Sequence, residues 1–171
     1  MTLTYGSNPY CLLDISSTEN ALYFFIDVSK SIFRYELHTQ NMSLIQLPSD
    51  ITVDCAVLTT AENGRLGFAR MEDSRLYLWS MDTGPMGDAG WEKIGVIHLE
   101  TLLPVNISIS YCFVGFAHGA GVFLVGTNEG LFSIERKSRR VKKLCDVPCG
   151  DGGILSVIPY MSFYTPVLGM A

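Results

Sequence analysis

The tripeptide Gly-Phe-Ala occurs twice in this chain, at 67–69 and again at 115–117. After a short polar turn, each copy is followed by a run of alternating large apolar residues, LYLW at 76–79 and VFLV at 122–125. The second triplet begins 48 residues after the first. A repeat of about 40–50 residues is typical of β-propellers, in which each unit is a blade of four antiparallel strands.

The repeat extends beyond the triplet. The turn after the second triplet is two residues shorter than the turn after the first, and an even change keeps the same side chains on the same face of a strand. A third copy without the triplet spans 21–48 and runs in the same order as 122–148: an aromatic strand, a polar turn, a second strand, a Glu, another turn and a closing strand that ends in Pro. This alignment pairs Phe33 with Phe132 and Glu36 with Glu135.

Local patterning supports strands throughout the chain. Apolar and polar residues alternate with a period of two, and turns rich in Gly, Asp and Asn separate the runs. One short helical turn is predicted at HLETLLP, 98–104. The sequence therefore predicts an all-β fold over residues 1–171: a single β-propeller-type domain or fragment, forming a partial kelch-like propeller of about three to four blades of four antiparallel strands. The expected blades, followed by an extra strand, are 10–48, 54–99, 111–148 and 154–159.

Several residues have expected places in this architecture. We expect the glycine of each triplet to lie where neighbouring blades crowd, with the Phe and Ala packed between sheets. Trp79 and Trp91 fall in predicted strands and are expected in the core or between blades. Because an incomplete propeller leaves a strand edge and a blade face uncovered, we also expect self-association through the open edge.

Composition limits the classes of partner and compartment. Hydrophobic residues make up 48% of the chain and charged residues 17%, unlike the low hydrophobicity of disordered segments. The net charge of −5 gives no overall positive field, so nucleic-acid binding is not expected. The N-terminal residues lack the pattern of a secretory signal, and no apolar run reaches the length of about 18 residues that a membrane helix needs. With five scattered cysteines that suit a reducing compartment, the expected location is cytoplasmic or nuclear.

No constellation of residues points to catalysis. No Ser or Cys lies in a nucleophile-like setting, and the three histidines are dispersed: His38, His98 and His118. The Gly-rich pieces at 84–90 and 149–153 lack the Lys-Ser/Thr ending of a phosphate-binding loop. Cys145 and Cys149 lack the spacing of a zinc site. The sequence therefore predicts no catalytic residue, no cofactor, no metal and no enzymatic activity.

The densest charge cluster is RKSRRVKK, residues 136–143, which holds six of the twelve basic residues. Such a cluster serves in some proteins as a nuclear-import signal and in others as a local anion patch. The alternative is structural: a solvated hairpin turn with a basic strand edge that discourages edge-to-edge pairing. The position of the cluster at the junction of two predicted strands favours the structural interpretation.

Four segments together resemble a known family: LGFARMEDSRLYLWS, HLETLLP, VGFAHGAGVFLVGTNEGLFSIERKSRRVKK and the ending VIPYMSFYTPVLG. They are similar to the C-terminal β-propeller region of plant F-box proteins, and the resemblance covers roughly 21–169. In that family an N-terminal helical F-box docks on the adaptor subunit of a cullin-type ubiquitin ligase, and the propeller recruits substrates for ubiquitination. The matching segments are scaffold strands, so they carry no catalytic or binding residue over to this chain.

The resemblance implies a protein-interaction module related to the substrate-recognition propeller of F-box proteins, without the F-box itself. Its implied partner is a protein substrate, and binding to the ligase adaptor is not expected without an F-box. Two alternatives stay open. One is a truncated, non-functional remnant, and the other, less favoured, is an enzyme on a propeller scaffold, which would need polar residues that converge at a central channel.

Overall fold

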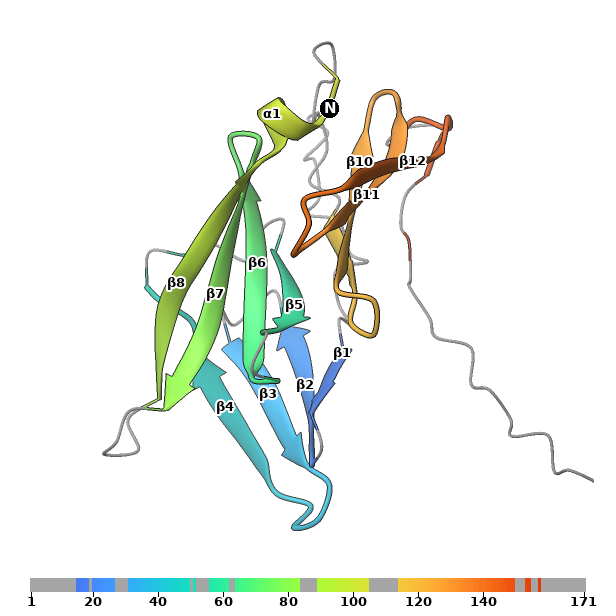
Figure 1. The fold of residues 1–171 in the computed structure, drawn as a ribbon. Helices are drawn as coiled ribbons and strands as arrows, with labels where there is room; N and C mark the ends of the chain where they lie inside the picture. The colour runs from blue at the N-terminus through green and yellow to red at the C-terminus, as the bar shows by residue number, and fades with distance from the viewer. Residues whose placement is uncertain are drawn as a thin grey trace, which may run out of the picture.

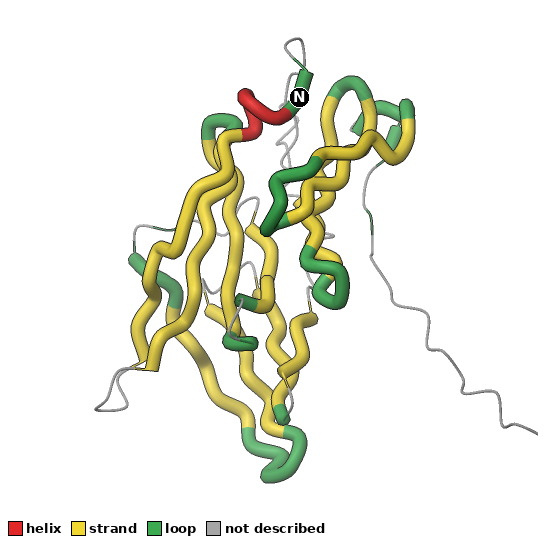
Figure 2. Tube along the Cα trace, viewed as in Figure 1, coloured by secondary structure: helices red, strands yellow, loops and turns green. Residues whose placement is uncertain are grey.

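In the residues that it describes, the structure, a computed structural model, contains β-strands, turns and one short helix (Figure 1, Figure 2). It describes residues 15–18, 20–26, 31–49, 51, 56–61, 64–83, 89–104, 114–149, 153–154 and 157. Over these residues the chain forms twelve strands in three sheets of four. The all-β class and the grouping of antiparallel strands by fours are therefore confirmed.

Each sheet is an antiparallel meander whose spatial order follows the chain. The first sheet consists of β1 (Ile15–Thr18), β2 (Ala21–Ile26), β3 (Ser31–Glu36) and β4 (Met42–Gln46). The second consists of β5 (Ala56–Thr60), β6 (Leu66–Glu72), β7 (Arg75–Thr83) and β8 (Ala89–His98). The third consists of β9 (Val114–Ala117), β10 (Val122–Thr127), β11 (Gly130–Glu135) and β12 (Val141–Cys145).

The predicted segments correspond to these elements where the structure describes them. The sheets fall within the three expected strand groups, and the expected helical turn is α1 (Leu99–Leu102). Of the expected extra strand at 154–159, Ile154 forms a parallel bridge with Cys149, whereas residues 155, 156, 158 and 159 lie outside the described part of the chain.

Two hydrophobic cores join the sheets in sequence order. The first core lies between the first and second sheets and includes Tyr23, Phe25, Ile32, Leu58, Leu66 and Phe68. The second core lies between the second and third sheets and includes Val57, Ala69, Leu76, Phe116, Phe123 and Ile134. Because alternate residues of a strand point to opposite faces, β5 and β6 supply side chains to both cores, and these two strands are buried on both faces. Burial on both faces explains the nearly continuous apolar runs of these two strands.

The first strands of the three sheets are neighbours in space. β5 lies beside β1 and also beside β9, whereas β4, β8 and β12 form the other edges of their sheets. Figure 1 shows this arrangement, in which successive sheets pack against one another around their first strands. Ends of different sheets are thereby brought together, and residues far apart in the chain meet there.

The aromatic residues singled out in the sequence lie between sheets, as predicted. Phe68 is fully buried in the first core, where the Trp79 ring stacks on it with centroids 4.7 Å apart. The Trp91 ring meets Phe68 edge-on at 4.8 Å, and its Nε1 donates a hydrogen bond to the backbone O of Gln46 at 2.9 Å. Trp91 therefore ties β8 of the second sheet to β4 of the first.

The prediction that neighbouring blades crowd the two glycines of the triplets is wrong, although a side chain at Gly67 would clash. An alanine Cβ at Gly67 would lie 2.7 Å from both Thr59 Oγ1 and the backbone O of Trp79, so the crowding comes from the flanking strands of its own sheet. At Gly115 the nearest atom would be the Cβ of Leu124, at an ordinary 3.5 Å. Neither glycine is needed for the approach of a neighbouring sheet; only Gly67 occupies a crowded position.

Candidate binding surface at the loop end

We use the name loop end for the four connections of the three sheets that lie away from α1; in Figure 1 they are spread from the lower tip of the molecule, at the β3–β4 turn, to about its middle, at the β11–β12 turn. They are the β3–β4 turn (37–41), the β5–β6 connection around Gly64 and Arg65, the β9–β10 turn (118–121) and the β11–β12 turn (136–140). The opposite end, which we call the helix end, carries α1 and the β6–β7 turn (Figure 1). Two groups of side chains at the loop end, one at each junction between sheets, are candidates for binding.

An open pocket of about 290 Å³ lies at the junction of the first and second sheets. Its walls are mainly apolar, with polar groups at two points; the lining residues are Tyr23, Arg34, Ile45, Gly64, Arg65, Leu66 and Met81. Apolar walls with a few fixed polar groups are the usual composition of ligand pockets. The volume is near the lower limit of that class, about 300 Å³, and suits one or two side chains of a peptide.

Both arginines of this pocket are ion-paired. Arg34 pairs with Glu36, whose carboxylate also accepts a hydrogen bond from Thr39 Oγ1 at 2.8 Å. Arg65 pairs with Asp82 Oδ1 at 2.5 Å. The local charges therefore balance, and the pocket offers hydrogen-bond donors on apolar walls instead of a net positive field.

A different arrangement, which we call the basic cluster, lies at the junction of the second and third sheets. It consists of Thr60, Phe116, His118, Arg136 and Arg139. The Arg136 guanidinium donates through Nη1 to the backbone O of Thr60 and lies 6.0 Å from the centroid of the Phe116 ring. This contact joins the end of β11 to the end of β5, 76 residues away in the chain.

His118 is held beside these groups in a fixed orientation. Its Nδ1 lies 3.0 Å from Thr60 Oγ1, and its ring meets Phe116 edge-on with centroids 5.0 Å apart. Burial lowers the pKa of His118, so the imidazole is neutral at neutral pH. The positive charge of the basic cluster therefore comes from its two arginines.

Arg136 and Arg139 differ in their ion pairs from four of the other five arginines that the structure describes; Arg140, which is exposed, also has no carboxylate partner among the described residues. Four arginines pair with carboxylates: Arg34, Arg65, Arg70 and Arg75. Among the described residues, no carboxylate pairs with Arg136 or Arg139. Burial and the neighbouring charge of Arg136 lower the pKa of the Arg139 guanidinium. Arg136 Nε and Arg139 Nη1 are shielded from water and have no hydrogen-bond partner within the described ranges.

The hairpin turn and the basic strand edge predicted for residues 136–143 are confirmed in outline. Residues 136–140 form the β11–β12 turn, and Lys142 and Lys143 are exposed on β12, at the edge of the third sheet. Lys137 and Arg140 are also exposed, whereas Arg136 and Arg139 fold back and are only half exposed. A fully solvated turn was therefore the wrong expectation for these two residues.

The β11–β12 turn has the same construction as the β3–β4 turn. In each turn the backbone N–H of a Glu donates a hydrogen bond across the turn. Glu36 N–H donates to Asn41 O, and Glu135 N–H donates to Arg140 O, both at 2.9 Å. Each Glu side chain accepts from a hydroxyl three residues later, from Thr39 in one turn and from Ser138 at 2.6 Å in the other. The following residue is left-handed in both turns, Gln40 with φ 57° and Arg139 with φ 58°. The predicted pairing of Glu36 with Glu135 thus corresponds to a shared turn.

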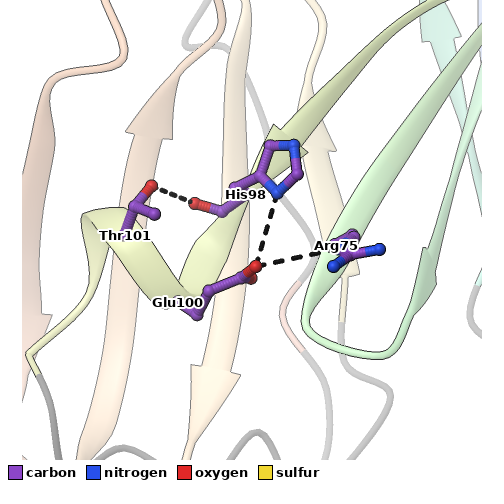
Figure 3. A network of polar contacts seen from close by, with 4 residues as sticks. All are labelled: Arg75, His98, Glu100 and Thr101. Atoms are coloured by element: carbon purple, nitrogen blue, oxygen red, sulfur yellow. Dashed lines mark hydrogen bonds and ion pairs between the residues drawn. The ribbon is translucent and has the colours of Figure 1, made fainter.

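The helix end carries a polar network with a structural role (Figure 3). The Glu100 carboxylate lies 3.3 Å from His98 Nδ1 and 3.7 Å from Arg75 Nε, and Thr101 Oγ1 donates to the backbone O of His98 at 2.9 Å. A hydrogen bond from its own backbone, with further contributions from His98 and Arg75, lowers the pKa of Glu100. These side chains are about half exposed and their charges are paired, so the network holds α1 against the β6–β7 turn and offers no unpaired charge to a ligand.

The three histidines are not brought together. His38 lies in the β3–β4 turn, His98 at the helix end and His118 in the basic cluster. Within the described ranges, no three His, Cys, Asp or Glu side chains gather in a way that could hold a metal ion. Over the same ranges, no helix is long and apolar enough to span a membrane.

Comparisons with known proteins give little further information. No protein-family model matches the chain, and no curated protein matches it at a significant level. Among solved structures it is similar to the extracellular domain of BT4673 from B. thetaiotaomicron, which is described as a putative one-component system. The identity is 14% over 78% of this chain, and the TM-score is 0.33. The chain spans 16% of the length of that structure.

Proposed function

We propose that this chain is a protein-interaction module built on a partial, kelch-like β-propeller. Three features support the propeller: the 48-residue repeat, the three four-stranded meanders, and the packing of successive sheets around their first strands. In this proposal the sheets are blades and β1, β5 and β9 are the innermost strands. The resemblance to the propeller region of plant F-box proteins supports the same scaffold.

The loop end is the proposed recognition surface. On a rigid β scaffold, binding residues are carried disproportionately by the connecting loops, because loops vary without loss of the core. The observation that carries the proposal is the pocket between the first two sheets, whose apolar walls hold the donors of Arg34 and Arg65. Arg34 Nε is buried and has no hydrogen-bond partner among the described residues, so a shift of the side chain toward a peptide carbonyl or side-chain oxygen would complete its polar contacts.

The proposed biological role is recruitment of a protein substrate, as in the F-box family that the sequence resembles. The ligase adaptor is not a proposed partner, because in that family the F-box makes the adaptor contact. A cytoplasmic or nuclear location is part of the same proposal. A non-functional remnant is the second candidate, and the test below separates it from a binding module.

The test is affinity capture from a plant extract with quantitative mass spectrometry, using the chain and two charge-reversal variants. Arg65→Glu places a carboxylate at the pocket, and Arg75→Glu makes the equivalent change at the helix end. Both arginines are about half exposed and ion-paired, so the two changes have similar small effects on stability. We expect a specific protein that is captured by the original chain and by Arg75→Glu but lost with Arg65→Glu.

Two results would contradict the proposal. Equal capture by Arg65→Glu would show that the pocket is not the recognition surface. Recovery of no specific protein by the original chain would favour the remnant.

A further inference from the structure

We propose that Arg136 and Arg139 form a binding site for a phosphate monoester dianion carried by a protein partner. The phosphate site follows from the geometry and charge of the basic cluster. Its assignment to a protein partner rests on the proposed function.

The positive charges of Arg136 and Arg139 are not compensated by any carboxylate in the described part of the chain. Two guanidinium groups stand close together at the junction of two sheets, each shielded in part from water, and no carboxylate among the described residues pairs with either. The nearest acid along the turn, Glu135, accepts its hydrogen bond from Ser138. Like charges that are partly desolvated repel each other more strongly than in water, so this arrangement lowers stability until an anion joins it. In a chain of net charge −5, such a pair of cations requires an explanation.

The two arginines also supply hydrogen-bond donors. Arg136 uses Nη1 on the backbone O of Thr60, which fixes the guanidinium plane beside the Phe116 ring. Arg136 Nε and Arg139 Nη1 have no acceptor among the residues that the structure describes, and because both atoms are shielded from water, the two side chains must shift for an anion to reach them. Unsatisfied donors on a held guanidinium are rare in folded proteins, and arginine forks are suited to the oxygens of phosphate.

The charge of the basic cluster matches that of a phosphate monoester. The two arginines supply two positive charges, and His118 adds none at neutral pH because burial keeps it neutral. A phosphate monoester carries a charge of about −1.5 to −2 at pH 7, whereas a carboxylate carries −1. The dianion neutralises the basic cluster, while a single carboxylate leaves one cation uncompensated. We therefore assign the site to a phosphate monoester rather than to an acidic side chain.

The turn offers a variant that removes one arginine without weakening the fold. Arg139 is left-handed, a backbone conformation that favours glycine, and its Nη1 has no hydrogen-bond partner in the described part of the chain. Arg139→Gly therefore deletes the guanidinium and relaxes the backbone. The matched control is Gln40→Gly, which makes the same backbone change in the corresponding turn of the first sheet.

The test is isothermal titration at low salt, first with N-acetyl-O-phosphoserine amide and then with the matching N-acetyl-glutamate amide. For the original chain and Gln40→Gly we expect binding of the phosphoserine derivative at least tenfold tighter than that of the glutamate derivative. For Arg139→Gly we expect at least a tenfold loss of affinity. Thermal melting should show both glycine variants to be at least as stable as the original chain. Unchanged affinity in Arg139→Gly, or equal affinity for the two derivatives, would overturn the phosphate site.

A second titration separates this site from the proposed function. A mixture of random peptides centred on phosphoserine is compared with N-acetyl-O-phosphoserine amide and with inorganic phosphate. Enrichment of particular sequences that bind at least tenfold tighter than the amino-acid derivative supports a phosphorylated protein partner. If inorganic phosphate or the derivative binds through Arg139 as tightly as every peptide does, the partner assignment is overturned and a small phosphate compound is the ligand.

Discussion

Replacement of Gly67 by alanine tests the origin of the repeated glycine. Gly67 lies in β6, paired with Thr59 of β5 on one side and Ser80 of β7 on the other. An added Cβ would lie 2.7 Å from Thr59 Oγ1 and 2.7 Å from the Trp79 carbonyl oxygen. Real Cβ atoms essentially never come closer than 3.0 Å to such neighbours, so one of the strands must move. The Thr59 side chain is buried and the other contact is backbone, so neither yields easily.

The expected cost follows from two opposing effects. Overpacking of a well-packed interior typically costs about 1–3 kcal/mol. Alanine in place of glycine restores about 0.4–1 kcal/mol, because the unfolded chain has less conformational freedom to lose. We therefore expect Gly67→Ala to lower the free energy of unfolding by about 1–2 kcal/mol and Tm by about 2–8 °C for a chain of this size.

Gly115 of the second triplet is the matched control. Its added Cβ would meet only ordinary contacts, 3.5 Å from the Leu124 Cβ being the shortest. Gly115→Ala should therefore raise the free energy of unfolding by about 0.4–1 kcal/mol. Urea unfolding, followed by circular dichroism and by the fluorescence of Trp79 and Trp91, measures both changes. Equal stability of the two alanine variants would refute the assignment of crowding to the flanking strands of Gly67.

Three further predictions follow from single positions. Gly130 has φ +131°, and a Cβ there would lie 2.1 Å from the Cys145 carbonyl oxygen. Gly130→Ala should therefore lower the free energy of unfolding, measured in urea, by about 3 kcal/mol or more. A smaller decrease than for Gly67→Ala would contradict this. Burial lowers the pKa of His118 in the folded chain, so its contribution to stability is present above the ordinary histidine pKa of about 6.5 and is lost as the pH falls below it. Between pH 7.5 and 5.5 the free energy of unfolding should therefore decrease more steeply for the original chain than for His118→Asn. An equal decrease for the two proteins would refute this prediction. Met42 and Leu44 are 66% and 54% exposed on the face of the first sheet opposite the first core. We therefore expect analytical sedimentation at micromolar concentration to show self-association of the original chain, and Leu44→Asp to weaken it. A monomeric original chain would contradict this prediction.

Much of the fold was predictable because the signals are local. The alternation of side chains along β2 and β3 sets one buried face, and hairpin turns of fixed length carry the chain to the next strand. The position of Phe68 between sheets followed from its place in a repeated apolar run. The role of Gly67 did not follow, because the crowding depends on the exact register of three strands, β5, β6 and β7.

The pocket and the basic cluster were not predictable as sites. Arg136 meets an oxygen 76 residues earlier in the chain, and no spacing in the sequence encodes that meeting. It depends on the packing of β5 beside β9, which is a property of whole sheets. The pocket likewise joins Arg34 and Arg65 from different sheets, and neither arginine stands in a recognisable motif.

The two related turns explain why the repeat located these loops without indicating their chemistry. The shared construction needs a Glu, a hydroxyl residue three positions later, and a left-handed residue next, and both Glu36 and Glu135 meet these conditions. The backbone conformation is held by these contacts, so the left-handed position itself tolerates different side chains, Gln40 in one turn and Arg139 in the other. Aligning the copies of the repeat therefore identifies the residues that build the turn. The residue that differs between the two turns is the one that carries information about binding. Arg139 differs from Gln40 by a charge that no described carboxylate neutralises, and this difference, rather than the repeat, directs attention to the loop end of the third sheet.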